Sequence, residues 1–347
     1  MSNKKKRKKK ERKMEETMDV LAIMKDRLHS NSIDEIHNIT LADWAHRWLE
    51  GYCPNIKQTT LDSYRSAVDN HIVRVFRDKK LFDITDDDVQ LFVLSLMQGI
   101  GLEESLQAKT IRNIHGVLHV CLQTAFEMKI IPYNPAEHTK LPKVKRPVIV
   151  PLNDEQIKAF LDAIRGHVYE PIYKLALFTG MRQGEILGLT NDCFNFSEGY
   201  IRLYQQLVRH KKKKNYYMDS LKNNRQRVIY PPKAIMDMMQ EYMKEHPSKK
   251  YVFTGKKFEH MTHPAVRNAF KKVVGKLGYP EFRFHDLRHT YAVMSLTARI
   301  DLKTISDFMG HHSVAFTMDT YVYILAEMKK ESAKRLQGFM DEKHYSI

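Results

Sequence analysis

The sequence is short of the features that mark membrane and secreted proteins. It has no apolar run of about 18 residues, the length a membrane-spanning helix needs. A lysine block stands at the N-terminus, where a signal peptide would need an apolar stretch. Only three cysteines occur (Cys53, Cys121 and Cys193), and they are far apart and lack metal-ligand spacing. We therefore expect neither a membrane span nor secretion, but a chain that acts in a reducing cytoplasm.

Acidic residues are also scarce relative to basic ones. The 57 Lys and Arg against 41 Asp and Glu give a net charge of +16, which indicates a polyanionic partner. Residues 1–13 carry nine of these cations and one Glu, so half of the net charge lies in a short tail. This tail could be a solvated segment, a non-specific contact to DNA phosphates or, from pattern alone, a nuclear-localisation signal.

The hydrophobic content of 43% is ordinary for a globular protein, and 347 residues suffice for two cores. Apolar spacing of three to four predicts four helices that begin near Thr40, Thr60, Thr85 and Thr110. Trp44 and Trp48 of the first helix are interpreted as core residues. The opposite faces carry cations that either keep the helices soluble or contact a polyanionic partner, namely Lys57, Arg65, Lys109 and Arg112.

Residues 138–152 contain three prolines, four Lys or Arg and no acidic residue, which is typical of a linker. Its cations include Lys143, Lys145 and Arg146, which suit contact with a polyanionic partner. Asn153 with Gln156 predicts a capping box that opens a second domain. Between residues 200 and 230 the period changes to that of strands, for which we predict a three-stranded antiparallel sheet with a basic loop at 210–215.

Two arginines, two histidines and a tyrosine form the most informative pattern, because together they can handle a phosphodiester. Arg182 and Arg288 stay protonated, and their planar forks can neutralise the charge that develops on an attacked phosphate. Tyr321 can supply the nucleophile. Its hydroxyl needs a proton acceptor or a positive field, which His285 and Arg288 can provide.

These residues stand in stretches that resemble the tyrosine recombinases, more narrowly the integrases of temperate phages and conjugative transposons. The resemblance covers roughly residues 38 to 325. Its motifs are Thr179-Gly-Met-Arg182-Gln-Gly-Glu185, the hairpin with Lys222, Phe284-His285-Asp-Leu-Arg288-His-Thr-Tyr291, and Met309-Gly-His311-His-Ser, followed by Tyr321.

The resemblance implies a mainly α protein with a helical core-binding domain and a mixed α+β catalytic domain that carries the small antiparallel three-stranded sheet. It implies a site-specific recombinase that forms a 3′-phosphotyrosine intermediate with neither metal nor other cofactor. The expected segments are a basic tail with a short helix (1–37), the helical SAM-like DNA-binding domain (38–137), the linker (138–152), the catalytic domain (153–325) and a C-terminal tail (326–347).

The resemblance also assigns roles to single residues. Lys222 would protonate the departing 5′ oxygen, and His311 would donate a hydrogen bond to a non-bridging oxygen. Glu185 would hold an arginine or histidine in place. Lys211, Lys212 and Lys213 compete with Lys222 but fall in an insertion, where contact to the DNA backbone is expected.

The implied partner is double-stranded DNA at attachment sites, bound by four protomers, with excision or host DNA-bending factors as further partners. The tail after Tyr321 could dock on a neighbouring protomer or fold back on its own domain. The 39 residues before Thr40 predict that the extra N-terminal domain of many relatives is not complete here. The expected location is a bacterial cytoplasm, at the nucleoid.

Several alternatives remain open at this level. A topoisomerase of type IB uses nearly the same residues to nick and reseal DNA, and a non-catalytic DNA-binding relative is a further class. His285 and His289, four apart, could bind zinc, although Asp286 stands where zinc hydrolases place Glu. Tyr323 is the rival nucleophile. Arg299 stands where relatives commonly have a helix-ending glycine, which leaves the turn there in question.

Overall fold

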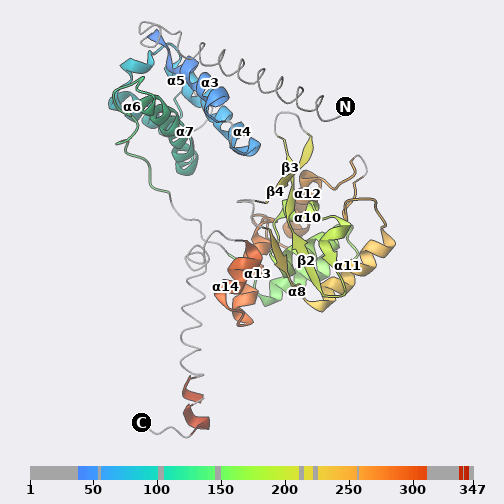
Figure 1. The fold of residues 1–347 in the computed structure, drawn as a ribbon. Helices are drawn as coiled ribbons and strands as arrows, with labels where there is room; N and C mark the ends of the chain where they lie inside the picture. Colours follow the sequence, from blue (N-terminus) through green and yellow to red (C-terminus); the bar gives the residue numbers. More distant parts are fainter. Residues whose placement is uncertain are drawn as a thin grey trace, which may run out of the picture. The chain divides into compact units, whose positions relative to one another are not determined.

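The computed structural model separates the chain into two compact units, one ending at residue 146 and the other beginning at residue 147 (Figure 1). We refer to them as unit 1 and unit 2. The structure describes residues 38–53, 56–100, 105–144, 150–210, 215–221, 226–255, 258–310, 336–338 and 340–343.

Unit 1 is helical and closes around one apolar core. Both tryptophans of its first helix are buried, and their indole N–H groups donate 3.0 Å hydrogen bonds, from Trp44 to the Cys121 carbonyl and from Trp48 to the Thr124 hydroxyl. The interpretation of both as core residues is confirmed. The elements are α3 (Leu41–Gly51), α4 (Gln58–Ala67), η1 (Val68–Ile72), α5 (Val73–Phe76), η2 (Leu81–Asp83), α6 (Asp86–Gln98) and α7 (Ala108–Glu127).

Two of the four predicted helix starts are confirmed by their caps. The Thr40 side chain accepts from the Asp43 N–H, and Thr85 forms a full capping box with Asp88. The other two helices begin earlier than predicted, at Gln58 and Ala108, without any side-chain cap. Without a capping side chain, little in the local sequence fixes the first turn, and packing decides where the helix begins.

The predicted apolar face of the second helix is wrong at its end. The three-to-four apolar spacing that runs through Val68 and Ile72 continues at Val75. Val75 is nevertheless 51% exposed, whereas Phe76 is 3% exposed. The reason is η1, a π-helical turn at Val68–Ile72. Its wider i→i+5 hydrogen-bonded turn rotates the following residues around the axis, so the next residue along faces the core.

The first part of the predicted linker folds against unit 1. Lys140 exchanges backbone hydrogen bonds with the Gln90 side chain, at 2.9 and 3.3 Å. Arg112 donates to the Pro142 carbonyl at 3.0 Å, so this candidate DNA contact also fastens the chain to α7. At the other end, Leu152 is buried in the core of unit 2.

Unit 2 places helices around two small antiparallel sheets. The predicted three-stranded antiparallel sheet is confirmed, in the order β1-β2-β5 with Ile201 opposite Ile229, but its strand β1 lies before the segment 200–230 in which the sheet was predicted. The strands are β1 (Phe194–Asn195), β2 (Tyr200–Leu203), β3 (Gln205–Arg209), β4 (Tyr216–Ser220) and β5 (Arg227–Ile229). The helices are α8 (Asp154–Ala163), α9 (Glu170–Thr179), α10 (Gln183–Leu187), η3 (Asn191–Cys193), α11 (Lys233–Glu245), α12 (His263–Lys276), α13 (Asp286–Thr297) and α14 (Leu302–Met309).

A second sheet was not predicted. The chain leaves the first sheet at Tyr204, and β3 and β4 then pair as a hairpin, with Leu207 opposite Met218. The predicted basic loop joins these two strands. Residues 200–209 are therefore divided between two sheets, and Leu203 of β2 and Leu207 of β3 are both buried.

The centre of unit 2 is α9, which packs against α13 and α11. It ends at Gly180, whose φ of +63° and contact with the Tyr291 ring leave no room for a Cβ. The predicted capping box of Asn153 and Gln156 opens α8 and is confirmed. Helices α13 and α14, drawn in orange, pack against each other (Figure 1). Arg288 of α13 and Gly310 at the end of α14 thereby lie close to the end of α9.

Candidate active site

Arg182 lies at the junction of α9 and α10. It is the N-cap residue of α10, and its backbone N–H donates to Glu185 Oε2 at 2.9 Å. Its Nη1 donates to Glu185 Oε1, also at 2.9 Å. The Arg182 side chain stays 27% exposed, so it is not closed off from solvent. The short helix thus fixes one arginine against an adjacent carboxylate and leaves donors for a ligand.

Glu185 is 1% exposed and binds a second arginine, Arg227 of β5. Arg227 approaches as a fork, with Nη1 3.1 Å from Oε1 and Nη2 2.7 Å from Oε2. Burial alone would raise the pKa of the Glu185 carboxyl. The ion pair and hydrogen bonds with Arg227, and then the charge of Arg182, outweigh burial and lower this pKa to about 2. Glu185 is therefore an anion at any physiological pH.

The carbonyl groups at the end of α14 accept hydrogen bonds from three arginines, Arg182, Arg227 and Arg288, which we call the arginine cluster. The carbonyl groups at the end of a helix lack intrahelical partners and carry partial negative charge, so cations are stabilised there. Gly310 takes a φ of +61° at this end, which the absence of a side chain permits. The bonds run from Arg227 Nε to the Phe308 carbonyl at 2.7 Å, from Arg182 Nη2 to the Gly310 carbonyl at 3.1 Å, and from Arg288 Nη2 to the Met309 carbonyl.

Arg288 is 3% exposed, which is rare for an arginine. Its Nη1 donates to the Gly180 carbonyl at 2.5 Å, and its Nη2 to the Met309 carbonyl. It thereby joins the ends of α9 and α14 from its place in the first turn of α13. The structure brings Arg182 and Glu185 of one stretch of the sequence together with Arg288, about a hundred residues later.

His285 stands at the N-cap position of α13. Its side chain is exposed to solvent. The protein atoms around the ring still displace part of its water, and this desolvation, followed by the charges of Arg288 and His289, lowers the pKa of His285 to about 4. The imidazole is consequently neutral at pH 7. The positive charges of Arg288 and Arg182 both contribute to this lowered pKa.

The zinc alternative has weak support in the described residues. The rings of His285 and His289 are 5.3 Å apart and perpendicular. Within the described part of the chain, no group of three or more His, Cys, Asp or Glu side chains could hold a metal ion. Asp286, the nearest acidic residue, is instead paired with Arg283 at 2.8 Å.

Other predicted site residues lie outside the described residues, and their roles stay predictions. These are Lys222, His311, Tyr321, Lys145, Arg146, Lys211, Lys212 and Lys213. The basic tail at 1–13 and the short helix expected before residue 38 also lie outside. His311 directly follows Gly310 in the sequence, and so it follows the carbonyl that accepts from Arg182.

The sequence interpretation missed Arg227. The motifs give Arg227 no role, whereas the structure makes it the principal partner of Glu185. A signal existed, because in strand β5 the side chains of Arg227 and Ile229 point to the same face, and Ile229 is buried. A cation on the inner face of a strand requires a buried partner.

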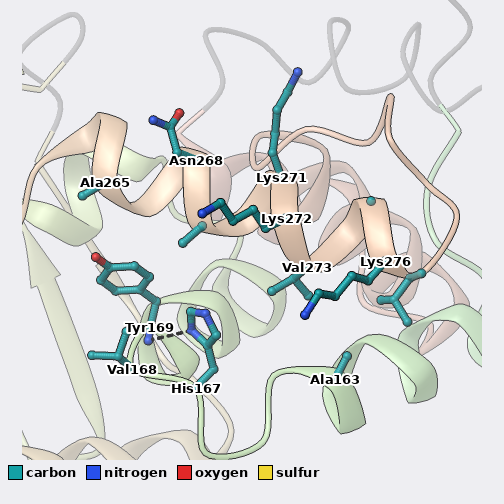
Figure 2. A pocket seen from close by; sticks show the side chains of 13 residues that line it. Ala163, His167, Val168, Tyr169, Ala265, Asn268, Lys271, Lys272, Val273 and Lys276 are labelled. Carbon is teal, nitrogen blue, oxygen red and sulfur yellow. Dashed lines mark hydrogen bonds between the residues drawn. The ribbon is translucent and has the colours of Figure 1, made fainter.

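The candidate DNA contacts of unit 1 are not buried in its core. Lys109 and Arg112 are exposed, and Lys57 and Arg65 are partly exposed. In unit 2, exposed lysines also line a groove between α12 and the α8–α9 connection (Figure 2). There Lys272 and Lys276 project from α12 opposite His167, which accepts from the Tyr169 N–H at 3.0 Å. Of the predicted catalytic residues that the structure describes, Arg182, His285 and Arg288, none lines this groove.

None of the described helices combines the length and the apolar character that a membrane span requires.

Comparison with known proteins gives the same assignment for both units. Residues 151–328, just over half of the chain, match the phage integrase family, and residues 40–97 match the N-terminal SAM-like domain of phage integrases. A tyrosine recombinase XerC-like protein of Caldanaerobacter subterraneus subsp. tengcongensis is 23% identical over 87% of this chain and 84% of its own length. Transposase A of transposon Tn554 from Staphylococcus aureus is 26% identical over 65% of this chain and 61% of its own length.

Solved structures support the fold. The Tn1549 transposon integrase, in complex with a circular intermediate DNA, has a TM-score of 0.72 at 20% identity and covers 84% of this chain and 99% of its own. A lambda integrase dimer bound to a core site has a TM-score of 0.60 at 20% identity, covering 80% and 97%. With the matches to both units and the arginine cluster of unit 2, the chain belongs to the phage integrase family, the tyrosine-type site-specific recombinases.

Proposed function

We propose that this recombinase cuts one strand of duplex DNA with Tyr321, holds the 3′ end as a phosphotyrosine, and rejoins the 5′ hydroxyl to a partner strand. The observation that carries the proposal is the convergence of Arg182 and Arg288 on the last turn of α14. The chain leaves that turn directly into His311 and reaches Tyr321 ten residues later.

The arginines would meet the charge that develops on the scissile phosphate. A pentacoordinate transition state carries one more negative charge than the diester, and donors fixed beforehand stabilise it without reorganisation. Glu185 and the Gly310 carbonyl hold Arg182 in one orientation, and the Gly180 and Met309 carbonyls hold Arg288. The clamp supplies positive charge that other enzymes take from metal ions.

The bonds and protons balance within the predicted residues. The Tyr321 oxygen attacks phosphorus, so that a tyrosyl P–O bond forms and the bond to the 5′ oxygen breaks. The phenolic proton goes to His285, which is neutral because its pKa is about 4 in the free protein. The 5′ oxygen takes a proton from Lys222, and His311 donates a hydrogen bond to a non-bridging oxygen. Rejoining reverses these steps with another strand and conserves the phosphoester.

The proposed partners are the attachment sites of a mobile element, bound by four protomers, with excision or DNA-bending proteins as accessory factors. A lambda integrase of the same fold is a tetramer on a Holliday junction. The cations Lys57, Arg65, Lys109 and Arg112 of unit 1 would grip one side of the site, together with Lys143, Lys145 and Arg146. We place the reaction in the bacterial cytoplasm, at the nucleoid.

The test is covalent attachment to a nicked suicide duplex made from the DNA that flanks the gene. Wild-type protein should give a protein–DNA adduct on a denaturing gel, and Tyr321→Phe should give none while still binding the duplex, because only the hydroxyl is lost. Tyr323→Phe is the matched control and should keep the adduct. An adduct that persists in Tyr321→Phe and disappears in Tyr323→Phe would assign the nucleophile to Tyr323.

Products distinguish recombination from simple resealing. With two sites on one plasmid, the proposed function yields exchanged junctions. Relaxation of supercoiled DNA without any exchanged junction would instead support the topoisomerase alternative.

A further inference from the structure

We propose that Arg227 is a positioning residue for Arg182, acting through Glu185 to keep the Arg182 guanidinium available to the phosphate. This inference rests on the proposed function and adds a residue to it. Arg227 is only 10% exposed, and its side chain uses Nε, Nη1 and Nη2 on protein acceptors. A side chain so occupied acts on the reaction through its neighbours.

The carboxylate of Glu185 is fully occupied. Oε1 accepts from Arg182 Nη1 and Arg227 Nη1, and Oε2 accepts from Arg227 Nη2 and the Arg182 backbone N–H. These four bonds fill the roughly four acceptor positions of a carboxylate. Because Arg227 takes both oxygens as a fork, Arg182 has only one side-chain bond to Glu185.

This arrangement decides where the rest of Arg182 points. Its Nη2 turns to the Gly310 carbonyl, and further N–H donors of the guanidinium are left for a ligand. Without Arg227, Glu185 would be a buried carboxylate with a single arginine partner. The favoured geometry of such a pair is the two-bond fork, which would draw Arg182 away from the phosphate.

Arg227 also fixes the turn on which the cluster is built. Its Nε donates to the Phe308 carbonyl at 2.7 Å, and a Cβ at Gly310 would lie 3.0 Å from its Nη1. The same side chain therefore holds Glu185 and the end of α14, the two groups that orient Arg182. Misplacement by about 1 Å can cost on the order of 10²-fold in rate, so an indirect role can have a large effect.

The first experiment measures single-turnover adduct formation on the nicked duplex for wild type, Arg227→Lys and Arg227→Gln. Lysine keeps the charge but cannot form the fork. We expect a roughly 10- to 100-fold slower rate for Arg227→Gln and a smaller loss for Arg227→Lys, with the DNA dissociation constant changed by less than about threefold. Arg202→Gln, an exposed cation on the neighbouring strand β2, should match wild type.

The second experiment identifies Arg182 as the group through which Arg227 acts. A methylphosphonate at the scissile position lacks the negative charge of one non-bridging oxygen, so cleavage depends less on the arginine clamp. The rate defects of Arg227→Lys and Arg182→Lys should both shrink on this substrate. In addition, Glu185→Gln should add little to the defect of Arg227→Gln, because the carboxylate that captures Arg182 is gone.

Equal defects on the two substrates would overturn the proposal and make Arg227 a general structural residue. A loss of affinity as large as the loss of rate would overturn it by making Arg227 a DNA contact. If Arg227→Gln does not fold, the test rests on Arg227→Lys, whose rate defect is compared between the phosphodiester and the methylphosphonate substrate. Failure of the proposed function can be told apart from failure of this inference, because in that case the wild-type protein itself forms no adduct.

Discussion

The two units of this protein place their charges in opposite ways. Among the described residues of unit 1, no Lys or Arg is buried, and the buried polar residues are Asp62, His115 and Asn134. In unit 2, Arg288 and Glu185 are almost inaccessible, and Arg227 is 10% exposed.

This difference reflects two uses of positive charge. Exposed cations in high dielectric attract a phosphate backbone from many directions, and salt screens them. Cations held in a protein interior act at one point, but their desolvation must be offset by partners such as Glu185 and helix-end carbonyls. Under the proposed function, exposed cations should contribute mainly to DNA affinity and buried cations mainly to the cleavage rate.

The largest expected effect comes from removing a buried cation. Arg288→Gln should lower the single-turnover cleavage rate by about 10²- to 10³-fold, with little change in DNA affinity, because the missing charge acts on the transition state. Single-turnover adduct formation and a binding titration on the same duplex measure the two quantities. Arg165→Gln, which removes an exposed cation of unit 2, is the matched control. A loss of affinity equal to the loss of rate would break the contrast between the units.

Removing the buried anion should cost stability. A pKa lowered from 4.5 to about 2 corresponds to about 3 kcal/mol of unfolding free energy at pH 7, which Glu185→Gln should lose. A carboxyl with a depressed folded pKa stabilises the fold above its unfolded pKa. The difference between wild type and variant should therefore narrow as the pH falls from 4.5 towards 2.

Urea unfolding at several pH values measures this difference. Asp162→Asn, which removes the exposed partner of Arg165, should cost far less, since exposed pairs contribute at most about 1 kcal/mol. A pH-independent difference would show that packing, and not charge, explains the loss.

Removing exposed cations of unit 1 should change affinity alone. If Lys109 or Arg65 neutralises a DNA phosphate, its replacement by Gln should lower the log–log slope of affinity against salt by about 0.9. The cleavage rate of protein already bound should stay the same. Binding titrations at several salt concentrations measure the slope, and an unchanged slope would assign these cations to solubility.

The smallest expected effect is on stability, and it should have the same size in both units. Lys129 after α7 and Arg299 after α13 both take a positive φ, of 60° and 66°. Each closes a helix end, with the next residue donating a 2.9 Å bond back into the helix. The turn at Arg299 is therefore formed without glycine. Lys129→Gly and Arg299→Gly should each stabilise by about 1 kcal/mol, since the left-handed region costs a side-chain-bearing residue about that much. Thermal unfolding measures both, and destabilisation would show that these side chains make compensating contacts.

Local features were predictable because their causes are local. A Thr or Asn with an acidic or amide residue three positions on makes its own cap, as at Thr85 and Asn153. The apolar spacing of α7 likewise identified its buried face. The π turn at Val68–Ile72 was not predictable from spacing, since packing around it determines the extra residue in the turn.

The sequence by itself determined the two units, the helical character of the first, the three-stranded sheet of the second and the membership of Arg182, Glu185, His285 and Arg288 in one motif set. Residue type, spacing and order carry that information. Only the tertiary structure decided that Arg227 is the main partner of Glu185 and that three arginines share the last turn of α14. The physical reason is that buried charges must find partners wherever the fold brings acceptors, and those acceptors include backbone carbonyls, which no residue type reveals.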